Sequence, residues 1–330
     1  MSQDSPLLEV EDLHVQFRTG RETVRAVNGA SFSVRAGEVM AVLGESGSGK
    51  SVAATTIMRL LQSPPGFVTG GQVRFNGTDI LRLPSEQWRG MLGANLGMVL
   101  QDALTALNPV FPIGKQIAEV FRVHGESRSV ANRRALDLLE RVGIPDPVLR
   151  ARDYPHQFSG GMRQRVMIAM AIALRPQLLI ADEPTTALDV TVQAQIMELL
   201  RSISREDGMA VLLITHDIGV VMDYADRVSV MYAGRVVEYG PVREVLEAPS
   251  HPYTLALLES APQARRKGSS LSPIVGSPPD MARPPSGCAF HPRCRFATAI
   301  CREAPPPRSL SAGRMSECHH SETLYARAAV

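Results

Sequence analysis

GEVMAVLGESGSGKS, residues 37–51, contains the pattern that indicates the fold class most directly. Its first half is apolar, as in a buried strand, and GESGSGKS at 44–51 fits the phosphate-binding pattern G-x-x-x-x-G-K-[S/T]. Glycines let successive backbone N–H groups point at phosphate oxygens, and a following helix adds its positive end. We therefore predict a helix over 51–61, contact of Lys50 with β- and γ-phosphates, and ligation of Mg²⁺ by the Ser51 hydroxyl.

The nucleotide-binding residues predicted in this stretch are consecutive. They are Gly44, Glu45, Ser46, Gly47, Ser48, Gly49, Lys50, Ser51 and Val52. The motif follows an apolar strand and precedes a possible helix, which is the context that a phosphate-binding loop requires.

A second motif, LLIADEP at 178–184, is an apolar strand that ends in two adjacent carboxylates. The carboxyl ends of strands in an open α/β sheet face the crevice where ligands bind. We expect Asp182 to hold Mg²⁺ and Glu183 to act as the general base on the attacking water. Together with the phosphate loop, the pair predicts an ATPase or GTPase.

The rest of the chain alternates strands and helices. QLLIAD (177–182) and AVLLIT (210–215) predict strands, and 190–206 and 217–225 predict helices, which favours a parallel sheet covered on both faces. Residues 7–17 alternate apolar and polar side chains, as the strands of a small half-buried sheet do. The predicted fold class is therefore α/β, of the phosphate-loop NTPase type.

Length and composition exclude several classes of protein. The chain has 330 residues, 35 Lys+Arg and 33 Asp+Glu, so its net charge of +2 predicts no nucleic-acid partner. The longest apolar run that we find, residues 166–174, is far shorter than the roughly 20 residues that span a bilayer. The polar, acidic N-terminus does not resemble a secretory signal. We therefore expect neither a membrane-spanning nor a secreted protein.

FSGGMRQRV, residues 158–166, resembles the signature of the ATP-binding-cassette family, usually written LSGGQ, with Met162 at the glutamine position. The resemblance implies a RecA-like core with a parallel sheet, a small antiparallel β subdomain and a helical signature subdomain. It also implies that Ser159, Gly160 and Gly161 bind the γ-phosphate of an ATP that a partner subunit holds. A helix N-terminus with two glycines and a hydroxyl suits such an anion.

The resemblance extends over most of residues 7–255. It implies that Gln101 lines the metal and faces the membrane partner, and that Asp189, in TALD (186–189), touches the opposite subunit. It implies that His216 holds the γ-phosphate and the attacking water in line, although a histidine after a strand can also be structural. Phe17 resembles the aromatic residue that stacks on adenine, and a core position on its strand is the alternative.

The C-terminal sequence narrows the resemblance to one branch of the family. HPYTLALLESAP (251–262), GCAFHPRCRFATAIC (287–301) and ECHH (317–320) resemble the end of the dipeptide/oligopeptide importer ATPases. We accordingly expect an ATP-binding domain over 1–255, with its helical subdomain at about 102–174, and a loop-rich extension over 256–330.

The resemblance also implies partners and a location. They are a second, related ATP-binding subunit, two transmembrane permease subunits and, through these, an extracytoplasmic solute-binding protein. The chain would lie peripherally on the cytoplasmic face of the bacterial inner membrane and use ATP and Mg²⁺ to energise peptide import. A nickel or glutathione importer is the alternative cargo class, and a soluble non-transport ATPase is the alternative function.

All four cysteines, Cys288, Cys294, Cys301 and Cys318, lie in this extension. Four thiolates can hold either Zn²⁺ or an iron–sulfur cluster, and structural zinc usually shows closer cysteine pairs than the C-x5-C-x6-C-x16-C spacing found here. The related importers are held to carry a [4Fe–4S] cluster in this tail. We therefore predict such a cluster, with zinc as the alternative, and expect it to order a proline-rich segment without a core of its own.

Overall fold

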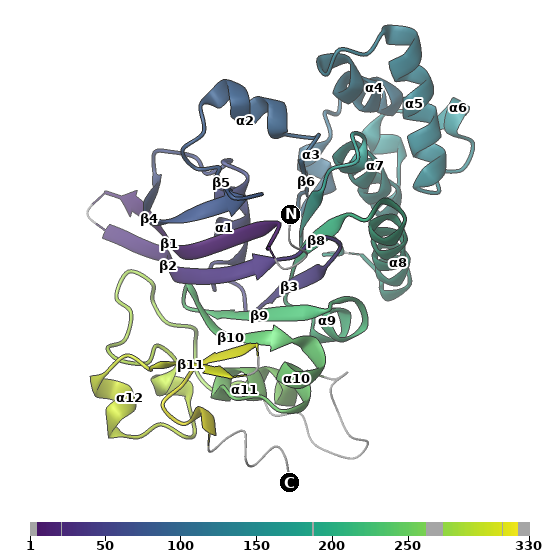
Figure 1. Ribbon diagram of the computed structural model, residues 1–330. Coiled ribbons are helices and arrows are strands. Elements are labelled where there is room, and N and C mark those ends of the chain that lie inside the picture. The colour runs from purple at the N-terminus through teal and green to yellow at the C-terminus, as the bar shows by residue number, and fades with distance from the viewer. Residues whose placement is uncertain (1–4, 21, 187, 262–272, 312, 323–330) are drawn as a thin grey trace. The chain divides into compact units, whose positions relative to one another are not determined.

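The computed structural model describes residues 5–20, 22–186, 188–261, 273–311 and 313–322 (Figure 1). The chain forms two compact units. The first unit contains residues 1–82 and 213–330, and the second contains residues 83–212. We call the described residues 273–311 and 313–322 the C-terminal extension.

A four-stranded antiparallel sheet begins the first unit. Its order is β2 (Glu22–Val34), β1 (Leu8–Thr19), β4 (Gly66–Phe75) and β5 (Thr78–Asp79). The buried side chains of β1 are Leu8, Val10, Leu13 and Val15, so the alternation changes phase after Val10. The register of β1 shifts at the same place against both neighbouring strands, which is the signature of a β-bulge. The bulge keeps both halves of the strand facing the core.

The other strands of the first unit surround the phosphate loop. β3 (Val39–Leu43) pairs in parallel with β9 (Arg227–Tyr232), which pairs antiparallel with β10 (Arg235–Pro241). The extension adds β12 (Arg314–Glu317) and β11 (Arg308–Ser311), giving the order β11-β12-β10-β9-β3 (Figure 1). Beyond β3 the order continues with β8 (Ala210–Thr215), in which the boundary between the units falls. The edge of β10 is therefore paired rather than open, with Glu238 opposite Ser316 and Tyr239 opposite Met315.

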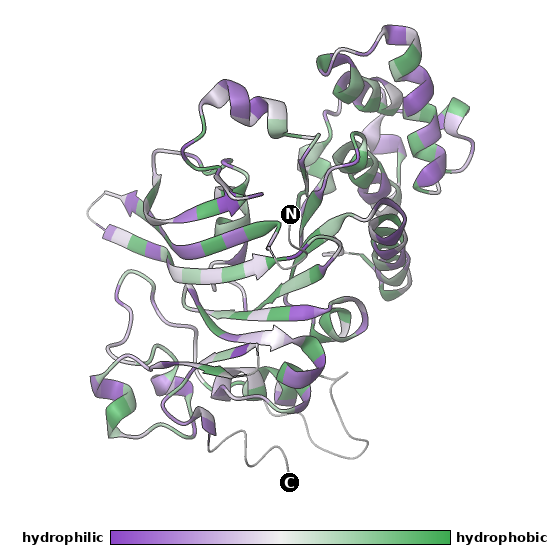
Figure 2. Cartoon of the chain, in the orientation of Figure 1, coloured by the Kyte–Doolittle hydropathy of each residue, from purple (hydrophilic) through white to green (hydrophobic). Residues whose placement is uncertain are grey.

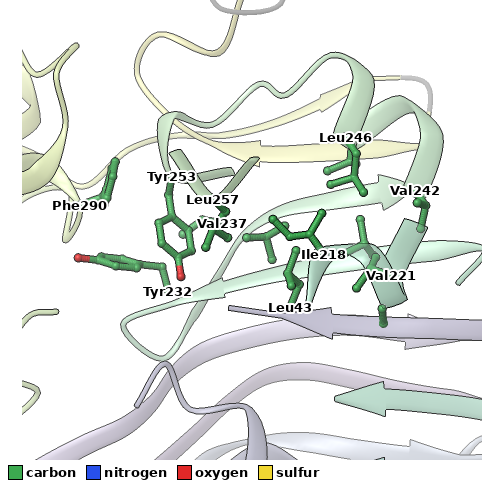
Figure 3. Packing of buried hydrophobic residues seen from close by; sticks show 14 of the residues in the cluster. Leu43, Ile218, Val221, Tyr232, Val237, Val242, Leu246, Tyr253, Leu257 and Phe290 are labelled. Carbon is green, nitrogen blue, oxygen red and sulfur yellow. The ribbon is translucent and has the colours of Figure 1, made fainter. Parts of the chain in front are cut away.

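Helices pack a hydrophobic core against these strands. The described helices of the first unit are α1 (Lys50–Ile57), α9 (Ile218–Tyr224), α10 (Val242–Glu247), α11 (Pro252–Ser260), η2 (His291–Arg293) and α12 (Ala299–Glu303). Figure 3 shows Leu43, Ile218, Val221 and Val237 in one cluster that continues to Tyr232, Tyr253 and Phe290. Phe290 belongs to the extension and is 2% exposed. The extension is therefore anchored through Phe290 on the core of the first unit.

Among the described residues, the second unit contains two complete strands, the first three residues of β8 and most of the helices. β6 (Leu96–Val99) pairs in parallel with β7 (Leu178–Asp182), whose five residues are all buried, as expected for a parallel strand. The helices are α2 (Ser85–Met91), α3 (Ala103–Ala106), α4 (Ile113–Val123), α5 (Arg128–Arg141), α6 (Pro147–Arg150), η1 (Pro155–Gln157), α7 (Gly160–Ile172) and α8 (Val190–Asp207). In Figure 2, α5 alternates hydrophilic and hydrophobic residues, whereas β8 is almost uniformly hydrophobic. This difference is that between a half-exposed helix and a fully buried strand.

Candidate nucleotide-binding site

The phosphate loop connects β3 to α1, where the sequence predicts it. Lys50 is only 4% exposed, and its ammonium donates to the backbone carbonyls of Gly44, at 2.7 Å, and of Glu45, at 2.9 Å. A buried ammonium must be hydrogen-bonded or paired, and the loop's own carbonyls supply these partners. The loop therefore closes around its lysine.

Two glycines of this loop cannot be replaced without a backbone shift. A Cβ at Gly44 would lie 2.3 Å from the carbonyl oxygen of Met231, and one at Gly49 would lie 2.4 Å from that of Ala26. Gly49 also has φ +101°, in the left-handed region, and is the N-cap of α1. These contacts explain why the motif needs glycine at both positions.

The donor set of the loop fits a polyphosphate. The Oγ of Ser48 is buried and has no hydrogen-bond partner among the described residues. No side chain caps the N-terminus of α1, so the orphan N–H groups of its first turn are not satisfied by a cap. An ammonium, a hydroxyl and backbone N–H groups are the ligands that proteins present to phosphate.

Two further predicted residues lie in the first unit. His216 follows the end of β8 directly and is exposed. The next residue, Asp217, caps α9 by accepting hydrogen bonds from the N–H groups of Gly219 and Val220. Phe17 lies on β1, opposite Val24 and Gly66, and is half-buried.

The predicted carboxylates lie in the second unit, at the carboxyl end of β7. Asp182 is the last residue of this strand and is 5% exposed. Glu183 follows it with φ +45°, a left-handed conformation that is uncommon outside glycine and turns the chain sharply. The Oε2 of Glu183 accepts hydrogen bonds from Nε2 of Gln101, at 3.1 Å, and from Oγ1 of Thr186, at 2.8 Å. The structure thus brings Gln101 to Glu183 and adds Thr186, whose contact the sequence did not predict.

The signature residues begin α7 in the same unit. Ser159 is the N-cap, and its Oγ accepts a hydrogen bond from the N–H of Met162 at 3.3 Å. Ser159 and Gly160 are exposed, whereas a Cβ at Gly161 would lie 2.6 Å from Val192 of α8. Asp189 caps α8 in the same manner, by accepting from Val192 N–H at 3.0 Å.

A hollow of about 280 Å³ connects two of these motifs within the second unit. Its lining residues are Gln101, Asp102, Ala103, Leu104, Gly160, Arg163, Gln164, Thr186 and Leu188. The predicted glutamine and the start of the signature helix therefore face the same space.

The prediction of a metal centre at the cysteines is wrong. Among the described residues, no three or more His, Cys, Asp or Glu side chains are gathered so that they could hold a metal ion. The four cysteines are free thiols, and Cys301 and Cys318 are buried. This finding contradicts the iron–sulfur cluster and gives no support to the zinc alternative.

The surroundings of the thiols give the physical reason. Burial raises the pKa of Cys288 and Cys294, and it raises that of Cys318 to about 12. A raised pKa makes the thiolate, which is the form that binds a metal, harder to form. The Sγ of Cys301 lies 3.6 Å from both Thr298 Oγ1 and His320 Nε2, within hydrogen-bonding reach. Packing around Phe290 and pairing of β12 with β10 order the extension instead.

Sequence reasoning also missed contacts made by the residue Glu45. Its carboxylate pairs with Arg293 of the extension, and its backbone N–H donates to Tyr253 of α11. Arg293 lies 248 residues away in the chain, so no local pattern could have indicated the pair. The only hint in the sequence was that Glu45, a charged residue, occupies the first unspecified position of the pattern G-x-x-x-x-G-K-[S/T].

The strand order, the phosphate loop after β3 and the carboxylates after β7 define a nucleotide-binding cassette. Two family profiles match the sequence. One is described as "ABC transporter", at residues 27–186, and the other as "Oligopeptide/dipeptide transporter, C-terminal region", at residues 237–301.

Named relatives match the chain along most of its length. The dipeptide transport ATP-binding protein DppD of Escherichia coli (strain K12) is 49% identical over 316 residues, which cover 95% of this chain and 96% of that protein. The oligopeptide transport ATP-binding protein OppD of Bacillus subtilis (strain 168) is 49% identical over 303 residues, which cover 91% and 85% respectively.

Solved structures match the cassette. The dimeric cassette MJ0796, bound to ADP and Pi in a post-hydrolysis state, superposes with a TM-score of 0.64 at 28% identity, over 72% of this chain and 99% of that one. CbiO1 of Clostridium perfringens, part of an ABC transporter complex, gives a TM-score of 0.63 at 28% identity, over 73% and 91%. These matches confirm the predicted fold.

The chain therefore belongs to the ATP-binding-cassette transporter family, as one of the ATPases of its dipeptide/oligopeptide branch. ATP-binding cassettes as a class bind ATP and Mg²⁺. Among the described residues, no helix is both long and apolar enough to span a membrane.

Proposed function

We propose that this chain is the ATP-hydrolysing subunit of an importer for dipeptides or oligopeptides. The observation that carries the proposal is the match to a dipeptide transport ATP-binding protein over 95% of this chain, extension included. The second profile, which covers residues 237–301, supports the same branch of the family. Both matches reach into the extension, so the likeness is not restricted to the cassette.

Each predicted residue would have its own role. Lys50 and the loop N–H groups would bind the phosphates, and Ser51, Asp182 and Gln101 would hold Mg²⁺. When bound, the metal would neutralise the negative charge that develops on the phosphate oxygens. His216 would fix the γ-phosphate and the water, Asp189 would touch the opposite subunit, and Phe17 would stack on adenine.

Glu183 would accept the proton of the attacking water. Gln101 and Thr186 both donate to its Oε2, so these two hydrogen bonds orient the carboxylate. A general base must be held within hydrogen-bonding reach of the proton that it abstracts, and the fixed Oε2 restricts the rotation of the carboxylate.

A second ATP-binding subunit would complete the site. Ser159 and Gly160 are exposed at the N-terminus of α7, where a partner's nucleotide could approach the helix end. We infer a related but different second subunit, two permease subunits and a solute-binding protein on the far side of the membrane. The chain would thus lie on the cytoplasmic face of the bacterial inner membrane.

Uptake by cells that lack this chain tests the proposal. Cells would be complemented with the wild-type chain or with Lys50→Ala, and uptake of a labelled dipeptide, a labelled tetrapeptide, labelled glutathione and ⁶³Ni²⁺ would be measured. We expect the wild type, but not Lys50→Ala, to restore peptide uptake, with no effect on nickel or glutathione. Restored nickel or glutathione uptake alone would instead support the alternative importers. No effect on any of the four would support a non-transport ATPase.

A further inference from the structure

The Glu45 carboxylate of the phosphate loop is bound by the C-terminal extension. Nη1 of Arg293 donates to Oε2 of Glu45 at 2.7 Å, and Nη2 donates to Oε1 at 3.0 Å. The Arg293 side chain is 4% exposed and that of Glu45 is 26% exposed. This is the bidentate geometry of the strongest ion pairs, and it is largely withdrawn from solvent.

Arg293 is itself fixed by the surrounding extension and by β9. Its Nε donates to the carbonyl of Val275 at 3.2 Å, and its Nη1 lies 3.4 Å from the hydroxyl of Tyr232. The guanidinium carbon lies 5.8 Å from the ring centroid of Tyr232 and 6.0 Å from that of Phe290. The hydrogen bonds to Glu45 raise the pKa of Arg293, so the group stays charged. Arg293 is thus a rigid cation rather than a mobile surface side chain.

The backbone of Glu45 is held on both sides. Its N–H donates to the hydroxyl of Tyr253 at 2.8 Å, and Tyr253 is completely buried between Tyr232 and Phe290. Its carbonyl accepts one of the hydrogen bonds from the ammonium of Lys50. A continuous series of contacts therefore runs from Arg293 through Glu45 to the lysine of the phosphate loop.

We propose that Arg293 is a positioning residue of the nucleotide site, through which the docked extension sets the affinity of the phosphate loop for ATP. Arg293 does so in two ways. It fixes the loop through Glu45, and it neutralises a carboxylate that would otherwise repel a bound polyphosphate. The inference rests on the proposed binding of ATP.

Two variants test whether the charge of Arg293 on the Glu45 carboxylate affects ATP binding. In the full-length chain, Arg293→Gln leaves the Glu45 carboxylate without its cation, so we expect Kd for a fluorescent Mg–ATP analogue to rise about tenfold. The double variant Glu45→Gln/Arg293→Gln removes the repelling carboxylate as well, so we expect its Kd to lie clearly below that of the single variant. A double variant as weak as the single one, or a single variant equal to the wild type, overturns the proposal.

The chain supplies a matched control in the same extension. Arg295 makes a bidentate but more exposed pair with Glu259, at 2.9 and 2.5 Å, and Glu259 belongs to α11 and not to the phosphate loop. Arg295→Gln should leave Kd unchanged, and a loss equal to that of Arg293→Gln would show a general effect of the extension and contradict the specific role. Failure of the wild type to bind the analogue would instead contradict the proposed function.

A reciprocal measurement needs no variant. If docking of the extension strengthens ATP binding tenfold, ATP must strengthen docking by the same factor, because the coupling free energy is shared. We expect a non-hydrolysable ATP analogue to slow hydrogen exchange at the amides of residues 288–294 about tenfold in the wild type. Equal exchange rates with and without the analogue would refute the coupling, even if Arg293→Gln failed to fold.

Discussion

The two units differ in how they hold the charges of their predicted site residues. In the first unit, the ammonium of Lys50 and the guanidinium of Arg293 are each 4% exposed and have fixed partners. In the second unit, Gln101 is exposed and Glu183 is half-buried, and the bond between their side chains lies at the surface. The first arrangement is prepared before any ligand binds, whereas the second can rearrange at little cost.

We therefore expect substitutions in the two units to affect different properties of the protein. Removing a buried charge in the first unit leaves its partner unsatisfied, which lowers stability or affinity. Removing an exposed group in the second unit leaves nothing buried without a partner, so only the rate of reaction should change.

Glu183→Gln should lower kcat for ATP hydrolysis by on the order of 10³-fold, because the base is lost while the hydrogen-bonding shape is kept. Nucleotide affinity should change by less than about threefold. Phosphate release and binding of a fluorescent analogue measure the two quantities. Glu198→Gln, an exposed position on α8, is the control. A Glu183→Gln variant that keeps a tenth of the wild-type rate would rule out the base role.

Arg314→Met should lower the free energy of unfolding by about 3 kcal/mol, because it leaves a buried carboxylate without its cation. Arg314 Nη2 donates to Glu238 at 3.2 Å and to the carbonyl of Ala248 at 2.6 Å, and Glu238 is only 1% exposed. Urea denaturation measures the change. The exposed pair of Arg243 and Glu247 gives the control, and Arg243→Met should cost less than about 0.5 kcal/mol. Equal losses in both variants would contradict the distinction.

Acid should destabilise the first unit through His251. Burial lowers the pKa of this ring to about 3, and its Nδ1 accepts a hydrogen bond from the N–H of Tyr253 at 3.0 Å. The unfolded ring binds a proton near pH 6.5 and the folded ring does not, so this contribution to stability is complete above pH 6.5 and falls as the pH drops toward 3.

The slope of the free energy of unfolding against pH shows the contribution of His251 alone when the wild type is compared with His251→Gln. Between pH 6.5 and the onset of acid unfolding, the wild type should lose about 1.4 kcal/mol per pH unit more than His251→Gln does. The comparison cancels the neighbouring Glu238, whose pKa burial raises and which is present in both proteins. Parallel stability–pH curves for the two proteins would show that His251 is not held neutral.

Thr186→Val should give the smallest effect. Loss of one hydrogen bond of about 1 kcal/mol to Glu183 should lower kcat about fivefold without changing stability, since this bond is exposed. Thr186→Ser keeps the hydroxyl and should restore most of the rate. If Thr186→Val lowered the free energy of unfolding instead, the hydrogen bonds around Glu183 could not rearrange at little cost.

The parts of the fold that were predicted correctly depend on residues close together in sequence. The phosphate loop after β3, the strand β7 ending at Asp182 and the helix α8 over Val190–Asp207 each follow from a local pattern of apolar residues and turns. The same is true of the signature helix α7, which starts at its serine cap.

What the sequence could not reveal depends on distant pairing. β12 joins the sheet through pairing with β10, which is distant in sequence, and its four residues carry no signal by themselves. The cysteine prediction failed for a related reason, since spacing along the chain does not determine which thiols are buried or whether they gather at one point. The contact of Arg293 with Glu45 was likewise invisible to pattern reasoning.

The pairing of β12 with β10 also constrains how the protein can be made. After β10 leaves the ribosome, residues 242–317 must follow before its free edge can be covered. At about 5–20 residues per second, this synthesis takes roughly 4 to 15 seconds. During that interval the nascent chain carries an unprotected strand edge, so the protein should depend on chaperones, or on slow expression, more than a cassette whose sheet closes early.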